Sequence, residues 1–478
     1  MPRRASPLVT FLVTSLALVM VSLDNLVVTI ALPVIRTDLH ASLSDLEWTV
    51  NAYTLTFAAL LLMGAALGDR FGRRRMFALG VAVFTLGSAF AALAPSAGTL
   101  IAARAFQGIG GAICMPLTLT LVSEAVPTDK RPLALGAWGG IGGLATAVGP
   151  VVGGAITQGL SWHWIFWVNV PIGILTLVLA WRLLDESVGP DRSLDLPGVG
   201  VASVGLVGIV WGVTHGNGSG WTSPQVVAPL VAGLALIGAF LVWERRARAP
   251  IMPLDLFRRR ASVTANGISF VMSFGMFGSI FLLSQFFQFV QGASPLDSGL
   301  RILPWTATPV IVAPIAGWAS GQIGARPLLA AGLALQAIGL AWTAALITTH
   351  VNYVSLIPAF VIAGAGMGLF FAPIANVVLS AVPREDAGKA SGVNNTIREL
   401  GGVFGVAVLG AIFSANGSYA SPQSYVDGII PGVFVGAAVV AAGAFLALAL
   451  PGSIARIGAT RRGGGAGDVA GADLELAA

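Results

Sequence analysis

Two charged residues interrupt apolar runs of about 20 residues, and they are the first candidates for chemistry. Asp24 lies within the run 9–33, and Arg104 lies near the start of the run 99–123. A charge at the centre of a membrane helix costs about 2.5–3.5 kcal/mol on insertion scales, so an interaction must offset it. Desolvation favours a protonated carboxyl, and we therefore expect Asp24 to exchange a proton or pair with a cation. The alternative is a permanently satisfied carboxylate, bonded to a neighbour such as Asn25.

Arg104 needs partners for the same reason. One interpretation is a proton relay, in which the guanidinium stabilises the ionised form of a nearby carboxylate. The other is a structural arginine bonded to backbone carbonyls of a neighbouring helix, and the residues alone do not separate the two.

A third charged site is the pair Arg398 and Glu399, near the start of a later apolar run. Adjacent residues point apart on a helix, so we expect each to have a different partner. Glu399 is a second candidate for proton coupling, and the alternative is a gate or an interfacial ion pair.

Two segments contain residues that favour a tight turn or a bend between helices. The segment 67–75 packs Asp69, Arg70, Gly72 and Arg73 into a tight turn, which predicts a latch that opens when two halves rock. A plain basic anchor would explain its arginines but not its acid. The segment 149–154, with Gly149, Pro150, Gly153 and Gly154, predicts close helix approach and a bend.

Phenylalanines recur at helical spacing at 270, 274, 277 and 281, with Gln285 and Gln288 following. Such a stripe could line an adaptable pocket for flat cations, although lipid-facing phenylalanine is the commoner arrangement. The candidate pocket residues are Asn25, Asn51, Tyr53, Phe274, Phe277, Phe281, Gln285 and Arg398.

The elements that carry these residues are predicted by composition. Of 478 residues, 56% are hydrophobic and only 10% are charged, far below the roughly 25% typical of soluble proteins. About fourteen segments are long enough to span a membrane. They cover 9–33, 47–68, 76–95, 99–123, 134–157, 164–184, 197–215, 225–243, 263–290, 300–322, 326–348, 353–380, 391–414 and 429–451. The N-terminal run lacks a cleavage site and continues past Asp24, so it predicts a first span and not a secretory signal.

Basic residues fall in alternate loops, which predicts the cytoplasmic side and, with an even number of spans, two cytoplasmic termini. Gly111 and Pro116 recur as Gly368 and Pro373 at one constant offset, and Ser123 and Asp129 recur as Ser380 and Asp386. Gly72 has a less well preserved counterpart in Gly324, where Gly321 replaces Asp69. This echo predicts two six-helix bundles, 1–190 and 251–455, separated by two inserted helices, 191–250, and followed by a disordered tail, 456–478.

Several functions are disfavoured. Cys114 is the only cysteine, and the four histidines are far apart, so a disulfide or a metal site is not expected. The chain has no P-loop, and its basic clusters are not interleaved with aromatics as in nucleic-acid binding. We expect a secondary transporter and not an enzyme, with no cofactor beyond the proton-motive force.

Together the motifs resemble the fourteen-helix drug:proton antiporter branch of the major facilitator superfamily, over nearly the whole chain. Segments 23–33, 65–75, 100–112 and 149–154 are similar to the first-helix, loop, proton-relay and antiporter motifs, and 162–173 is similar to a segment characteristic of the branch. Ala65 and His163 stand where Gly and Arg are usual. By that resemblance, Asp24 and Arg104 serve proton coupling, and the Gly-Pro bend indicates export.

The resemblance implies proton-coupled efflux of lipophilic or cationic drugs by a multi-pass protein of the bacterial cytoplasmic membrane. Its partners would be a small lipophilic substrate, protons and the bilayer, without nucleic acid, and we expect a monomer. A nutrient importer or a lipid exporter of the same fold is the alternative. Spans 300–322 and 326–348 lack acidic residues, which argues against broad dication transport.

Overall fold

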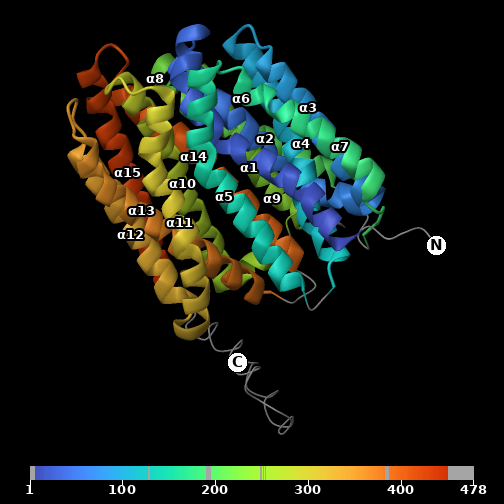
Figure 1. Cartoon of the computed structure of the whole chain (residues 1–478). Helices are drawn as coiled ribbons and strands as arrows, with labels where there is room; N and C mark the ends of the chain where they lie inside the picture. Colours follow the sequence, from blue (N-terminus) through green and yellow to red (C-terminus); the bar gives the residue numbers. More distant parts are fainter. Residues whose placement is uncertain are drawn as a thin grey trace.

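The computed structural model describes residues 6–127, 130–189, 195–247, 250, 252, 254–382 and 387–450. These residues form helices joined by short turns, and none of them is in a strand (Figure 1). Fourteen helical stretches are long and apolar enough to cross a membrane, which confirms the predicted number and the all-α class.

The first group of helices is α1 (Pro7–Asp38), α2 (Leu43–Phe71), α3 (Arg73–Ala92), α4 (Ala97–Ala125), α5 (Arg131–Gly159), α6 (Trp164–Trp167) and α7 (Asn169–Leu183), with α6 and α7 sharing one span. Then follow α8 (Leu196–Ser219), α9 (Pro224–Glu244) and the short 3-10 helix η1 (Leu254–Arg258). The last group is α10 (Arg260–Phe289), α11 (Pro295–Ile323), α12 (Ala325–Leu346), α13 (Tyr353–Ser380), α14 (Ala387–Asn416) and α15 (Pro422–Leu448).

Helix ends follow local signals. Ser42 and Asp45 form a capping box that begins α2, with the Asp45 amide donating to Ser42 Oγ at 3.2 Å. The last span begins at Pro422 and not at 429, because Ser421 caps a polar first turn that hydropathy alone does not detect. Gly72 and Gly324, the predicted counterparts, each separate two helices with a positive φ, 105° and 88°.

Pro116 lies within α4 and Pro373 within α13, as the internal echo requires, while Asp129 and Asp386 lie outside the described residues. The predicted boundary near residue 190 and the predicted tail at 456–478 also lie outside them.

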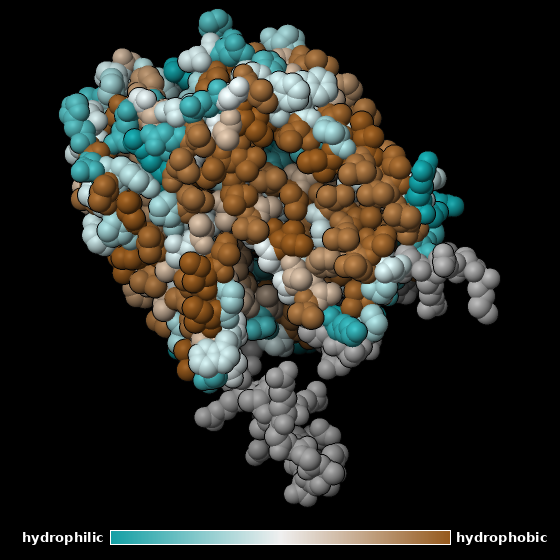
Figure 2. Space-filling view, in the orientation of Figure 1, coloured by the Kyte–Doolittle hydropathy of each residue, from teal (hydrophilic) through white to brown (hydrophobic). Residues whose placement is uncertain are grey.

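Helices pack mainly within two groups. In the first, α4 packs on α2 and α3, and α1 packs on α5; in the second, α10 packs on α14, and α12 on α13 and α15. Helix α9 packs on α8, which in turn contacts α2 and α14. The groups meet where α5 contacts α11 and α2 contacts α14, and we call them the N-terminal and C-terminal bundles. Figure 2 shows a broad apolar surface between polar ends, as a bilayer-embedded protein requires.

Several bonds between the bundles lie at one end of the molecule. Ser284 Oγ donates to the Thr29 carbonyl at 3.1 Å, and Gln288 donates to the Ile30 carbonyl at 2.8 Å. The Leu296 amide donates to Gln158 Oε1 at 3.3 Å. We call this the outer end, since it carries the loops that the sequence predicts to be extracellular.

Candidate functional site

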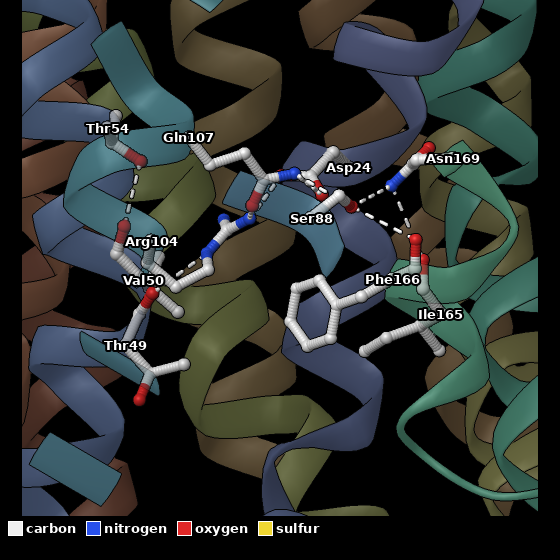
Figure 3. A network of polar contacts seen from close by, with 10 residues as sticks. All are labelled: Asp24, Thr49, Val50, Thr54, Ser88, Arg104, Gln107, Ile165, Phe166 and Asn169. Carbon is white, nitrogen blue, oxygen red and sulfur yellow. Dashed lines mark hydrogen bonds and ion pairs between the residues drawn. The ribbon is translucent and has the colours of Figure 1, made fainter. Parts of the chain in front are cut away.

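A buried ion pair joins α1 to α4. The Arg104 guanidinium donates to Asp24 Oδ2, and both side chains are 1% exposed (Figure 3). The carboxylate near Arg104, which the sequence left unnamed, is thus Asp24. Eighty residues separate the two in sequence, and the packing of α4 on α1 brings them together.

Gln107 completes this pair. Its amide donates to Asp24 Oδ1 at 2.9 Å, and its Oε1 accepts from Arg104 at 2.7 Å. Asp24 therefore takes its described bonds from α4 and not from Asn25, which is half-buried. The site is a charge pair with both oxygens of the carboxylate bonded, so the attraction between the two charges and the amide hydrogen bond offset the cost of burying them.

The network continues into α3 and α6–α7. Gln107 Nε2 lies 3.4 Å from Ser88 Oγ, which donates to the Phe166 carbonyl at 3.0 Å, and Asn169 donates to Ser88 Oγ at 3.0 Å (Figure 3). The sequence did not single out Gln107, Ser88 and Asn169 as members of this network. Gln107 had a detectable signal, since it lies one helical turn from Arg104; isolated Ser and Asn residues in a span have none.

Arg104 also has the backbone partner that its structural interpretation predicted. Its Nε donates to the Thr49 carbonyl of α2 at 3.2 Å, and its guanidinium lies 4.2 Å from the Tyr53 ring centre. Arg104 thus has both the carboxylate neighbour that the relay interpretation requires and the backbone carbonyl that the structural interpretation requires. Tyr53 is fully buried and its hydroxyl has no hydrogen-bond partner among the described residues.

The second candidate, Glu399, differs from its prediction in one respect. Arg398 and Glu399 pair with each other at 2.9 Å, so the expectation of separate partners was wrong. The long arginine side chain curls back along the helix, which the simple angle between adjacent residues ignores. Glu399 is 4% exposed, its Oε2 has no hydrogen-bond partner among the residues that the structure describes, and Tyr53 lies within its electrostatic range.

The pocket candidates do not gather around one cavity. Phe274 and Phe281 are buried and Phe270 and Phe277 half-buried, so the stripe is not simply lipid-facing. It packs on glycines of α14: a methyl group at Gly402 would lie 2.9 Å from the Phe277 ring.

The remaining candidates are spread over other regions. Asn51 is fully buried, and neither end of its amide has a described partner. Gln285 lies near the outer end, where its Oε1 accepts from Tyr419. A hollow of about 790 Å³ among Gln291, Arg301 and Tyr353 contains none of the candidates.

The loop after α2 forms ion pairs within the N-terminal bundle. Arg73 bonds Asp69 at 2.7 Å and also pairs with Glu124 at the end of α4. Gly72 is left-handed there, and a methyl group on it would lie 2.7 Å from the Glu186 carboxylate. Arg70 is exposed and lies 5.3 Å from the Phe71 ring. The sequence did not identify Glu124 or Glu186 as partners, because acids in loops have many other uses.

The segment 149–154 allows close approach, as predicted. A methyl group at Gly153 would lie 2.7 Å from the Val27 carbonyl oxygen of α1, and one at Gly154 would lie 2.7 Å from Leu296 Cα of α11. Gly149 faces Leu26, and Pro150 lies inside an uninterrupted α5. Small residues thus let α5 lie close to α1 of its own bundle and to α11 of the C-terminal bundle.

Comparison with known proteins agrees with this architecture. The sequence model of the Major Facilitator Superfamily matches residues 14–406 and 265–467. The multidrug resistance protein Stp of Mycobacterium tuberculosis is 37% identical over 85% of this chain and 76% of its own. The puromycin resistance protein pur8 of Streptomyces alboniger is 35% identical over 91% and 88%, and the tetracenomycin C resistance and export protein of Streptomyces glaucescens is 32% identical over 90% and 80%.

Solved structures show the same fold. A bacterial homologue of the lysosomal transporter Spinster, in an inward-facing conformation, matches with a TM-score of 0.66 at 18% identity over 92% of this chain and 95% of its own. A D-xylose-proton symporter matches with a TM-score of 0.64 at 16% identity over 92% and 97%.

Fourteen spans around a buried charge network define a polytopic membrane transport protein. The chain belongs to the major facilitator superfamily, and its relatives are bacterial drug-resistance and export proteins. It is a multi-pass protein of the bacterial inner membrane.

Proposed function

We propose that this chain exports lipophilic or cationic antibiotics across the cytoplasmic membrane in exchange for protons, by alternating access of its two bundles. The observation that carries the proposal is the buried pair of Asp24 and Arg104 with Gln107. An ionised carboxylate at this depth needs its cation. A proton on Asp24 would neutralise the carboxylate and remove its attraction to Arg104, so the two side chains could separate.

Proton binding would leave Arg104 with Gln107, the Thr49 carbonyl and the Tyr53 ring as partners. The network then carries one more positive charge, and it accommodates a cationic substrate less well. Proton and substrate would therefore alternate, which is the requirement of antiport. Glu399 is the proposed second proton site. It belongs to the C-terminal bundle and lies within electrostatic range of Tyr53 of the N-terminal bundle.

Antibiotics are the proposed substrate class because relatives of this chain are named for resistance to puromycin and for tetracenomycin C export. We propose that Asn51, Tyr53, Phe274, Phe277 and Arg398 come together around the substrate in another conformation of the cycle, since they line no common cavity in the described part of this one. The helices α2 and α14, which carry three of them, contact each other across the bundles. Buried amide and hydroxyl groups without partners supply polar contacts there, and aromatic rings supply adaptable apolar ones.

The remaining parts take supporting roles in this proposal. In this proposal both termini are cytoplasmic, and the Gly149–Gly154 face of α5 is the surface on which the bundles rock. The ion pairs of the 67–75 turn stay within the N-terminal bundle, so its proposed role is to hold the inner ends of α2, α3 and α4 together while the bundles move. The chain works as a monomer.

The energetics suit one or two protons per cycle. Export against a hundredfold gradient costs about 2.7 kcal/mol. One proton crossing about 100 mV supplies about 2.3 kcal/mol, and each pH unit adds about 1.4 kcal/mol.

The test is efflux of ethidium and puromycin from cells that express the wild type or Asp24→Asn, with and without a protonophore. We expect export by the wild type that the protonophore abolishes, and at least a tenfold lower rate for Asp24→Asn at equal expression. Export that persists with the protonophore would contradict proton coupling. If a well-expressed wild type exports no tested drug, the nutrient-importer and lipid-exporter alternatives take precedence.

A further inference from the structure

Glu47 is a buried acid that the Asp24 network does not use. It lies near the start of α2, close to the outer end, and only 2% of its surface is exposed. Its Oε2 has no hydrogen-bond partner, and no cationic nitrogen of the described residues lies within 4.0 Å of its carboxylate. An ionised carboxylate in this position is costly by several kcal/mol, so the group requires an explanation.

The carboxyl group of Glu47 lies against the opposite bundle. A methyl group at Gly410 of α14 would lie 2.7 Å from Glu47 Cδ, so the glycine makes the room that the carboxyl occupies. This contact belongs to the α2–α14 interface, one of the places where the bundles meet. Opening of the outer end would expose Glu47 to external water.

Arg36 and Tyr419 lie beside it. The Arg36 guanidinium stacks 3.8 Å from the Tyr419 ring centre, and its Nε has no hydrogen-bond partner. Burial raises the pKa of the Tyr419 hydroxyl, Arg36 lowers it and Glu47 raises it, so Tyr419 lies within electrostatic range of both charged groups. Tyr419 remains protonated and donates to Gln285 Oε1 of α10. The cluster therefore joins α1 and α2 of one bundle to α10 and the α14–α15 turn of the other.

Apart from Arg36, the described parts of the helices packed against α2 offer Glu47 no counter-ion. The acids of α1 are engaged elsewhere, Asp24 with Arg104 and Asp38 with the Trp162 indole, which donates to it at 2.7 Å. Arg104 of α4 is engaged with Asp24, and His215, the one titratable residue of α8, stacks on Trp211 at 4.1 Å. The titratable residues of α14 are Lys389, Arg398 and Glu399, all about three turns or more from Gly410. Those of α3 are Arg73, Arg74 and Arg75 at the opposite end.

We propose that Glu47 is an outward-facing proton site whose neutral form allows α14 to close over it. A proton from external water binds a carboxylate oxygen when the outer end is open, and the neutral carboxyl is then buried against Gly410. The ionised form holds the outer end open, because closure would strip water from an unpaired charge. This proposal rests on the proposed proton antiport and assigns a step to it, since external acid returns the empty transporter to the inner side.

The sign of the effect follows directly. Low external pH favours neutral Glu47 and a closed outer end, and high external pH favours ionised Glu47 and an open one. For a single group the open-to-closed ratio changes by up to about tenfold per pH unit.

The experiment measures that ratio by distance. Spin labels on Gly98→Cys and Thr348→Cys, both exposed at the outer end of different bundles, are introduced with Cys114→Ala into the full chain in lipid nanodiscs. Electron-electron resonance distances are recorded between about pH 5 and about pH 9. We expect the long-distance population to increase with pH in the otherwise unmodified chain.

Four further variants test the assignment. Glu47→Gln should stay closed at every pH, so its open-to-closed ratio should change less than about twofold over the pH range. Glu47→Asp retains a carboxyl, and its open-to-closed ratio should still rise with pH. Asp427→Asn, an exposed acid at the same end, should behave as the parent. A parental titration in Glu47→Gln overturns the proposal, and so does a parent that does not respond to pH. Asp24→Asn should keep the titration while losing export, which separates failure of this proposal from failure of the proposed function.

Discussion

At the scale of residues, three of the buried carboxylates, Asp24, Glu47 and Glu399, have three different kinds of surroundings. Asp24 has a cation and an amide on its two oxygens, Glu399 shares one oxygen with its neighbour Arg398, and Glu47 has neither. The cost of ionisation therefore differs among them, because desolvation is offset fully, partly or not at all.

The pair at Asp24 also carries a stability prediction. Arg104→Met should leave Asp24 buried without its cation and cost about 3–5 kcal/mol. The double variant Asp24→Asn with Arg104→Met should recover most of that loss, since it removes both charges and keeps the volume. The measurement is the thermal unfolding midpoint of purified protein in detergent.

These variants form a double-mutant cycle, in which the single variant Asp24→Asn is the control for loss of the acid alone. If the double variant unfolds at a temperature no higher than Arg104→Met, the two charges do not stabilise each other in the folded protein.

At the scale of elements, ion pairs hold together the ends of α2, α3 and α4. Arg73 is the centre of this group, because it bonds Asp69 and Glu124 while its side chain is only 11% exposed. Arg75, two residues on, is 63% exposed and pairs only weakly with Glu186 at 3.5 Å. The same charge in one loop thus has very different surroundings.

This contrast predicts different effects for two matched substitutions. Arg73→Ala should lower the free energy of unfolding by about 1.5–3 kcal/mol, because two acids lose a charged donor. Arg75→Ala should change it by less than about 0.5 kcal/mol, since exposed pairs contribute little. Thermal unfolding of both variants in one detergent measures the difference, and equal midpoints would contradict the assignment.

At the scale of the whole molecule, the bundles are bonded to each other at the outer end. Thr29 and Ile30 of α1 accept bonds from α10, and Gln158 of α5 accepts one from Leu296. Helix α8 adds a bridge, since Trp48 donates to its Thr214 and its Asn217 bonds Ser414. A transporter that works by alternating access must break these contacts once per cycle.

A cross-link at this end should therefore stop transport. The variants Gln158→Cys and Leu296→Cys are introduced together with Cys114→Ala, and the two new thiols are joined by a short cross-linker that a reductant can cleave. This cross-link should abolish export, because the outer end can no longer open. Reductant should restore it. The measurement is ethidium efflux from vesicles before and after reduction, with each single cysteine variant as the control, and export at the parental rate by fully cross-linked protein would exclude opening at this contact.

The sequence by itself determined the spans and the family. Apolar runs must be helical in a bilayer, where each backbone group needs a partner within its own segment, so the fourteen spans were predictable from local composition. The motifs around Asp24 and Arg104 were local as well, and so was the left-handed glycine at 72.

Only the tertiary structure decided which side chains meet. Asp24 and Arg104 lie 80 residues apart, and their pairing depends on how α1 and α4 rotate about their own axes, which no local pattern encodes. Glu47 lies next to Trp48 in the sequence, at the start of a span where an acid is unremarkable. Its burial depends on α14, which covers it at Gly410, because burial is a property of the packed bundles and not of the helix that carries the residue.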